Sequence, residues 1–89
     1  MEQKARRNAV GQAVRRARVA KGWSQDALAA KLQLAGGSMT RGTLAKVESG
    51  IRGTSDIELF LFSEVLGMAL ESLFPRDMAK RVRRGDFVS

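Results

Sequence analysis

Apolar residues recur along this chain at the three- and four-residue spacing of helices. Between Asn8 and Lys21 they occupy Val10, Ala13, Val14, Ala17 and Ala20. Because an α-helix has 3.6 residues per turn, these positions share one face, and the basic residues Arg15 and Arg16 fall elsewhere. The pattern predicts an amphipathic helix over residues 8 to 21, which Gly22 ends.

A second helix is predicted from the Ser24 cap to Leu34. The Ser24 hydroxyl can accept a hydrogen bond from an amide of the first turn, and Trp23 can pack on Leu28 across that turn as a hydrophobic staple. Gly36-Gly37 should break this helix, because glycine costs about 1 kcal/mol inside a helix and accepts the positive φ of a turn.

A third and shorter helix is predicted between Thr40 and Gly50, with the same kind of start. Thr40 is its expected N-cap, Met39 before it can pack on Leu44, and Leu44 with Val47 forms a buried stripe. The segment therefore spans only two to three turns.

The exposed side of this third helix is slim and basic. The residues that lie away from the buried stripe are Arg41, Gly42, Ala45 and Lys46, so two cations flank positions with almost no side-chain bulk. A helix of this shape can enter the major groove of DNA, which is about 12 Å wide, and place its first residues against base edges.

After residue 52 the pattern becomes apolar. Ser55 and Glu58 are spaced as a capping box, and the runs 59–62 and 65–66 that follow contain only apolar residues. A helix this apolar needs cover on two sides. One side is expected to close the core, and the excess aromatic surface is expected to pair with another subunit.

Both ends of the chain are basic. Residues 1 to 7 are expected to form a mobile arm, and residues 8 to 75 the folded domain. The tail over residues 76 to 89 fits two structures: a helix through Met78 and Val82, or a small hairpin around Gly85-Asp86. As a basic segment it could add phosphate contacts or serve dimerisation.

Charge is unevenly distributed along the chain. The 89 residues carry a net charge of +7, with seven cations and one acid in residues 1 to 22 and four acids but no cation in residues 53 to 74. Such a chain can present a positive face to a polyanion, so nucleic acid is the first candidate partner. RNA is disfavoured, because Trp23 is assigned to a staple and the phenylalanines to the core.

The composition argues against catalysis. A single domain of this length is too small for a two-lobed cleft, and the sequence has no cysteine or histidine to act as zinc ligand or general base. We therefore expect no catalytic residue, no metal site and no cofactor. No apolar run approaches the roughly 20 residues that span a bilayer, so the protein is predicted to be soluble and cytoplasmic, without a membrane role.

Two strings of the sequence resemble a known family. Residues 24 to 29, SQDALA, and residues 40 to 52, TRGTLAKVESGIR, are similar to the helix-turn-helix of the phage repressor and Cro-like (XRE) family of transcriptional regulators. The resemblance runs from about Val10 to Phe74. It implies an all-α, compact five-helix bundle of the lambda-repressor-like DNA-binding type, whose short fifth helix would cover residues 69 to 74.

The chain departs from the family pattern in a lengthened connection between helices two and three. We interpret it as an extended second helix with a glycine turn. The alternative is that Gln33, Ser38 or the amides of Gly36-Gly37 come near a phosphate.

The resemblance also implies roles for single residues. The positions that match base-facing residues are Arg41, Gly42 and Lys46, and those that match phosphate-contacting residues are Gln25, Thr40, Thr43 and Arg52. A glutamate on a DNA-facing helix would repel phosphate, but in the family this glutamate pairs with an arginine of helix one. The corresponding residues here are Glu48 and Arg18.

The sequence therefore predicts a regulator that binds double-stranded DNA sequence-specifically, as a homodimer on an inverted-repeat operator, and acts as a repressor. A separate protein partner, such as a cognate toxin, fits a small regulator of this kind. The alternative is a protein-interaction module, an antitoxin or adaptor, that uses the same fold and turns its basic face to an acidic protein.

Overall fold

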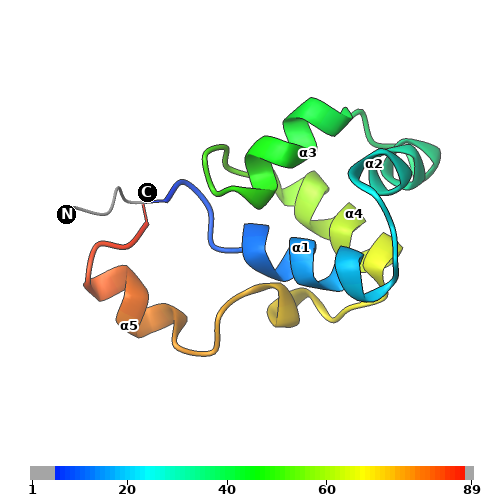
Figure 1. The fold of residues 1–89 in the computed structure, drawn as a ribbon. Helices are drawn as coiled ribbons and strands as arrows, with labels where there is room; N and C mark the ends of the chain where they lie inside the picture. The colour runs from blue at the N-terminus through cyan, green and yellow to red at the C-terminus, as the bar shows by residue number, and fades with distance from the viewer. Residues whose placement is uncertain (1–5, 88–89) are drawn as a thin grey trace.

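Helices make up the regular secondary structure of residues 6 to 87, which are the residues that the computed structural model describes (Figure 1). In chain order they are α1 (Gly11–Ala20), α2 (Gln25–Leu34), α3 (Arg41–Glu48), α4 (Asp56–Leu66), the 3₁₀ helix η1 (Leu70–Leu73) and α5 (Met78–Arg83). The all-α class expected from the sequence is confirmed, with five α-helices in this range. None of the helices in residues 6 to 87 is long and apolar enough to cross a membrane.

Three helices begin at the hydroxyl caps that the sequence predicts. The hydroxyls of Ser24, Thr40 and Ser55 accept from amides three residues ahead, at 3.0, 3.3 and 3.1 Å. At Ser55 the capping box is complete, because Glu58 Oε1 accepts from the Ser55 amide at 2.9 Å. Each such cap stabilises its helix by about 1 kcal/mol, so these helix starts can be predicted from the sequence.

α1 begins at Gly11 rather than at Asn8, where the pattern placed its start. The Asn8 side-chain oxygen accepts from the amides of Val10 and Gly11, at 3.2 and 2.8 Å. An asparagine that bonds to amides just ahead of it favours a turn, so the helix starts after that turn. Of the predicted apolar face, Val10, Ala13 and Val14 are buried and Ala17 is half-buried. Ala20, at the C-terminal end of the helix, is exposed.

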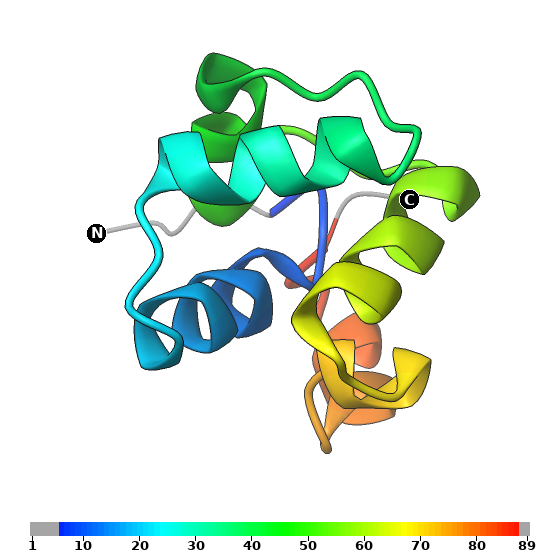
Figure 2. The same cartoon turned by 90° about the vertical axis from the view of Figure 1, so that its right-hand side faces the viewer.

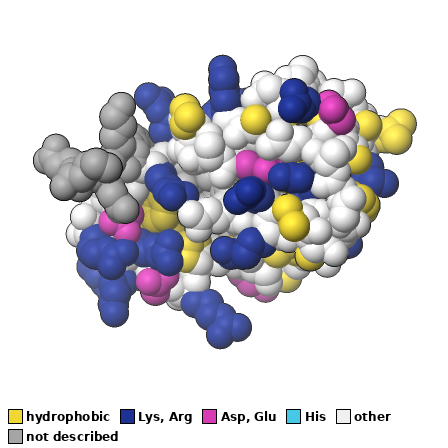
Figure 3. Space-filling view, viewed as in Figure 1, with side chains coloured by type: hydrophobic (Ala, Val, Ile, Leu, Met, Phe, Trp, Pro, Cys, Tyr) yellow, Lys and Arg dark blue, Asp and Glu magenta, His cyan; other side chains and the backbone are white. Residues whose placement is uncertain are grey.

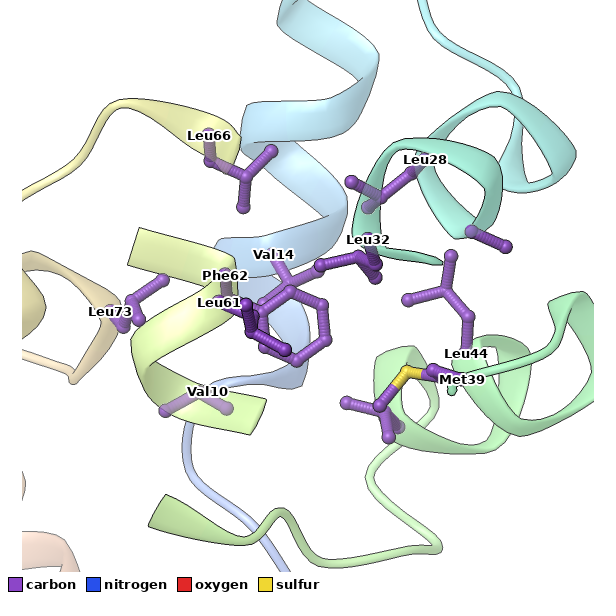
Figure 4. Packing of buried hydrophobic residues seen from close by; sticks show 12 residues of the cluster. Val10, Val14, Leu28, Leu32, Met39, Leu44, Leu61, Phe62, Leu66 and Leu73 are labelled. Atoms are coloured by element: carbon purple, nitrogen blue, oxygen red, sulfur yellow. The ribbon is translucent and has the colours of Figure 1, made fainter. Parts of the chain in front are cut away.

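The core lies between the first four helices. In Figure 2, α2 runs above α1, and α4 closes the side of the pair. Figure 4 shows the ring of Phe62, from α4, at the centre, with Val14 of α1 and Leu32 of α2 directed toward it. The buried cluster consists of Val10, Val14, Leu28, Ala29, Leu32, Met39, Leu44, Val47, Leu61, Phe62, Leu66 and Leu73.

Trp23 packs partly against this core from the turn between α1 and α2. The ammonium groups of Lys31 and Lys21 lie 4.5 and 5.2 Å from the centroid of its ring. Both distances are within the range of cation–π attraction. The specific staple between Trp23 and Leu28 stays a prediction.

The connection between α2 and α3 is a glycine turn after an extended α2, as expected. Gly36 has a φ of +108°, which an L side chain rarely adopts, and a Cβ on Gly37 would lie 2.9 Å from Leu61 Cδ1. The amides of the two glycines donate to the carbonyls of Gln33 and Leu32, at 3.0 and 2.9 Å. These amides are satisfied inside the turn, which favours a plain turn over a phosphate contact by the glycine amides.

The C-terminal region differs from the expected short fifth helix over residues 69 to 74. That segment forms the single 3₁₀ turn η1, and its cap residue, Ala69, makes no side-chain cap hydrogen bond. The fifth α-helix instead lies in the tail. Of the two structures that fitted residues 76 to 89, the helix is therefore right as far as Arg83. Phe87 forms a parallel bridge with Arg6 in place of a tail hairpin.

The described end of the predicted N-terminal arm lies against the domain. The Arg6 amide donates to the Asp86 carbonyl at 2.7 Å, and the Arg7 amide donates to the Gly50 carbonyl at 3.0 Å. Residues 1 to 5 of the arm, and residues 88 and 89 of the tail, lie outside the described residues. The division of the chain at residues 7 and 75 stays a prediction.

Candidate nucleic-acid interface

α3 buries one side and exposes the other. Leu44 and Val47 are fully buried, whereas Arg41, Gly42 and Lys46 are exposed. A Cβ placed on Gly42 would meet nothing within 4 Å in the described chain, so the surface next to Arg41 is open. The three residues expected to face bases therefore share one accessible face of one helix.

The first turn of α2 contacts α3 at two points. Gln25 Nε2 donates to Glu48 Oε1 at 3.1 Å, and Asp26 Oδ2 lies 3.8 Å from Arg41 Nε. The Asp26–Arg41 pair is exposed on both sides, so it contributes less than about 1 kcal/mol and leaves Arg41 available. The N-terminus of α2, whose amides attract anions, therefore lies beside α3.

The ion pair between Arg18 and Glu48 that the family resemblance implied is present, and it is bidentate. Arg18 Nε donates to Glu48 Oε2 at 2.8 Å, and Nη2 donates to Oε1 at 2.9 Å. The side chains are only 12% and 3% exposed. The hydrogen bond and the charge of Glu48 raise the pKa of Arg18 against the opposing effect of burial. Arg18 Nη1 also donates to the Trp23 carbonyl at 2.9 Å, so one side chain ties α1, the α1–α2 turn and α3 together.

Asn8, in the turn before α1, and Gly11, the first residue of α1, lie against the C-terminal end of α3. The sequence did not single them out for this role. The buried Asn8 side-chain amide donates to the Val47 carbonyl at 3.1 Å and to the Arg52 carbonyl. A Cβ on Gly11 would lie 2.2 Å from the same Val47 carbonyl oxygen, so only glycine fits there. No local pattern signals such contacts, because their partners lie about forty residues away in the chain.

Arg52, expected at a phosphate, is engaged within the protein. Its Nη1 and Nη2 atoms donate to the two carboxylate oxygens of Glu58, at 3.0 and 3.1 Å, and Nη1 also donates to the Gly53 carbonyl at 2.8 Å. The hydrogen bond to Glu58 raises the pKa of Arg52, and the same contact lowers the pKa of Glu58. Of the five guanidinium N–H groups, two stay available, so a phosphate contact by Arg52 stays a prediction.

The two threonines at the start of α3 bond to each other. Thr40 Oγ1 accepts from the Thr43 amide at 3.3 Å and lies 3.2 Å from Thr43 Oγ1. Thr40 is exposed and Thr43 is half-buried. Thr40 thus combines a helix-capping role with exposure at the same end of α3 as Arg41.

Six of the seven residues expected to contact DNA are gathered on α3 and the adjoining turn of α2. They are Gln25, Thr40, Arg41, Gly42, Thr43 and Lys46, whereas Arg52 lies beyond the C-terminal end of α3. Lys and Arg side chains are spread widely over the face of the molecule seen in Figure 3. Within residues 6 to 87 no group of three or more acidic residues is placed to hold a metal ion.

An exposed basic helix held against a second helix by a turn, inside a small helical bundle, defines a helix-turn-helix protein. The sequence profile of the helix-turn-helix family matches residues 14–73, and the chain belongs to this family. It is thus a DNA-binding regulator of the Cro and C1 type. Neither the curated proteins nor the solved structures compared with the chain include a significant match.

Proposed function

We propose that this protein is a transcriptional repressor that binds an inverted-repeat operator as a homodimer, with α3 of each subunit in the major groove of one half-site. The observation that carries the proposal is the shape of α3. Its first turn exposes Arg41 next to the bare surface at Gly42, while its other side is fixed by Leu44, Val47 and Glu48. A helix whose buried side is packed firmly and whose exposed side carries little side-chain bulk can approach base edges closely.

In this proposal Arg41 and Lys46 read bases. Arginine and lysine bind O6 and N7 of guanine, which is worth about 1–3 kcal/mol of discrimination. Gly42 allows close approach of the backbone. The phosphate contacts fall to Gln25, Thr40, Thr43 and Arg52, and they fix the register of the protein on the duplex without specifying sequence.

Dimerisation is proposed on the exposed apolar side of α4. Ile57 and Phe60 are 64% and 57% exposed, and their spacing of three residues places them on one face. Exposed large apolar side chains on neighbouring positions are typical of protein–protein contacts. In this proposal, repression results from occupation of a promoter. The protein is proposed to act in the cytoplasm.

Selection of bound duplexes from a random DNA pool tests this proposal. It is run at near-physiological salt, because phosphate contacts at low salt hide sequence preference. The proposal expects an enriched inverted repeat whose half-site centres lie about 34 Å apart or a multiple of that distance. A folded protein that enriches no sequence would contradict it and favour an interaction module with an acidic protein partner.

A further inference from the structure

A basin of about 680 Å³ opens between the N-terminal half of α1, the segment from η1 to α5, and the end of the tail. None of the described residues that line it belongs to α2, α3 or α4, so it is separate from the proposed DNA-binding surface. Figure 3 shows basic side chains gathered over the α5 region, at the lower left, with apolar surface between them and the rest of the molecule.

The basin is strongly basic. The arginines that line it are Arg6, Arg16, Arg76, Arg81 and Arg84, and its acids are Asp77 and Asp86. Asp77 pairs with Arg81 at 2.8 Å and Asp86 with Arg84 at 2.6 Å, so each acid is matched by one cation. The other three arginines have no carboxylate within 4 Å in residues 6 to 87.

One of these three arginines is held in place. In its hydrogen-bonding orientation, the Gln12 side-chain oxygen accepts from Nη1 and Nη2 of Arg6, at 2.9 and 3.1 Å. The Arg6 backbone is fixed as well, by its bridge to Phe87 and its bond to Asp86. A positioned guanidinium loses less side-chain entropy on binding an anion than a freely rotating one.

The basin also has aromatic walls. Phe74 and Phe87 both line it and are partly buried, and Phe74 also packs against the core. Guanidinium groups bind phosphate oxygens in a fork, and aromatic faces stack on nucleobases. The volume lies within the roughly 300–1,000 Å³ that is usual for small-molecule sites.

We propose that this basin is a binding site for a free nucleotide that carries two or more phosphates, with the arginines on the phosphates and the phenylalanine rings against the base. The three unmatched cations suit a di- or triphosphate better than a single phosphate. Asn8 and Gly11 also line the basin, and both lie against the Val47 carbonyl near the end of α3. A ligand in the basin would therefore lie next to the residues that pack against the end of α3.

Calorimetric titration of the full chain with ATP tests the site without DNA, so its outcome is independent of the proposed repressor function. We expect saturable binding of one ATP per chain, with adenosine and inorganic tripolyphosphate each binding at least tenfold more weakly. Arg16→Gln and Arg76→Gln should each weaken ATP binding at least fivefold.

The matched controls are Arg15→Gln and Arg83→Gln, which remove the same charge from α1 and α5 at exposed positions outside the basin lining. They should change ATP affinity less than twofold. Equal losses in controls and basin variants would overturn the proposal, because diffuse charge would then explain the binding. Tripolyphosphate binding as tightly as ATP, displacement of ATP by any duplex DNA, or no saturable binding would also overturn it. Thermal unfolding of each variant establishes that it is folded.

Discussion

Gln25 and Arg18, from two different helices, donate to the same oxygen of Glu48. Gln25 Nε2 lies 3.1 Å and Arg18 Nη2 2.9 Å from Glu48 Oε1. The single carboxylate near the end of α3 thus sets the position of that helix against both α1 and α2. A glutamate that looks misplaced on a helix proposed to face DNA is accounted for by this shared contact.

Replacing Arg18 with methionine should lower the free energy of unfolding by about 3–5 kcal/mol, because Glu48 is left charged and buried without its partner. The double variant Arg18→Met with Glu48→Met should recover most of that loss, since both charges are removed together. Urea unfolding at neutral pH measures both variants. A single variant as stable as the wild type would show that the pair is not buried in solution.

The Arg52–Glu58 pair predicts a pH dependence of stability. The folded-state pKa of Glu58 is lower than its ordinary value of 4.5, chiefly because of the hydrogen bond from Arg52. The folded protein therefore holds this proton more weakly than the unfolded chain does. The stabilisation is present above about pH 4.5 and is lost as the pH falls through the folded-state pKa.

Glu58→Gln keeps an acceptor for the Ser55 amide but removes the charge. It should cost about 0.5–1 kcal/mol at pH 7, because the pair is partly exposed, and the cost should shrink toward pH 3. Glu64→Gln, at an exposed position of the same helix, is the matched control and should change stability little at either pH. A cost for Glu58→Gln that is the same at both pH values would rule out this account.

Two glycine-to-alanine changes should have opposite effects on stability. Gly42→Ala fills open space in a helix and should raise the free energy of unfolding by about 0.5–1 kcal/mol. Gly11→Ala should lower it by more than about 1 kcal/mol, since its Cβ would lie 2.2 Å from the Val47 carbonyl oxygen. Thermal unfolding compares them, and a stabilising Gly11→Ala would show that α1 and α3 are not so close.

Gly42→Ala is expected to change stability and DNA affinity in opposite directions. If the backbone at Gly42 approaches a base, the stabilised variant should bind the selected operator at least fivefold more weakly than the wild type does. Fluorescence anisotropy with labelled duplex measures this, and an unchanged affinity would mean that Gly42 only provides space.

The proposed dimer surface predicts an effect on assembly. Phe60→Ser should shift the protein toward monomer, with little loss of monomer stability, because the side chain is 57% exposed. Val19→Ser on α1 is the matched control, since Val19 is 59% exposed on a helix outside the proposed surface. Analytical ultracentrifugation at several concentrations distinguishes them, and an equal shift in both variants would argue against α4 as the dimer surface.

Much of the fold is predictable from local sequence because local interactions fix it. The hydroxyl caps at Ser24, Thr40 and Ser55 act within one turn, so the starts of α2, α3 and α4 follow from a few residues. The burial of Leu44 and Val47 follows from helical periodicity for the same reason. The Arg18–Glu48 pair came from the family resemblance, not from any local pattern.

The features that were not predicted from the sequence depend on contacts between distant segments. The support of α3 by Asn8 and Gly11 exists only once the start of α1 is packed against the end of α3. The bond between Arg52 and Glu58 depends on the path of the intervening loop, although the capping role of Glu58 was visible locally. In the tail, helix and hairpin patterns overlap, and packing of the chain ends decides between them.

Duplex selection carried out in parallel with the wild type, Arg41→Ala and Arg15→Ala tests most directly the claim that the first turn of α3 reads bases. Arg41→Ala should lose preference at one base pair in each half-site, equivalent to about 1–3 kcal/mol, and keep the rest of the motif. Arg15→Ala, which removes an exposed cation from α1, should enrich the wild-type motif. If Arg41→Ala enriches the same motif as the wild type, or lowers affinity equally for every sequence, Arg41 does not read bases and the proposed role of α3 is wrong.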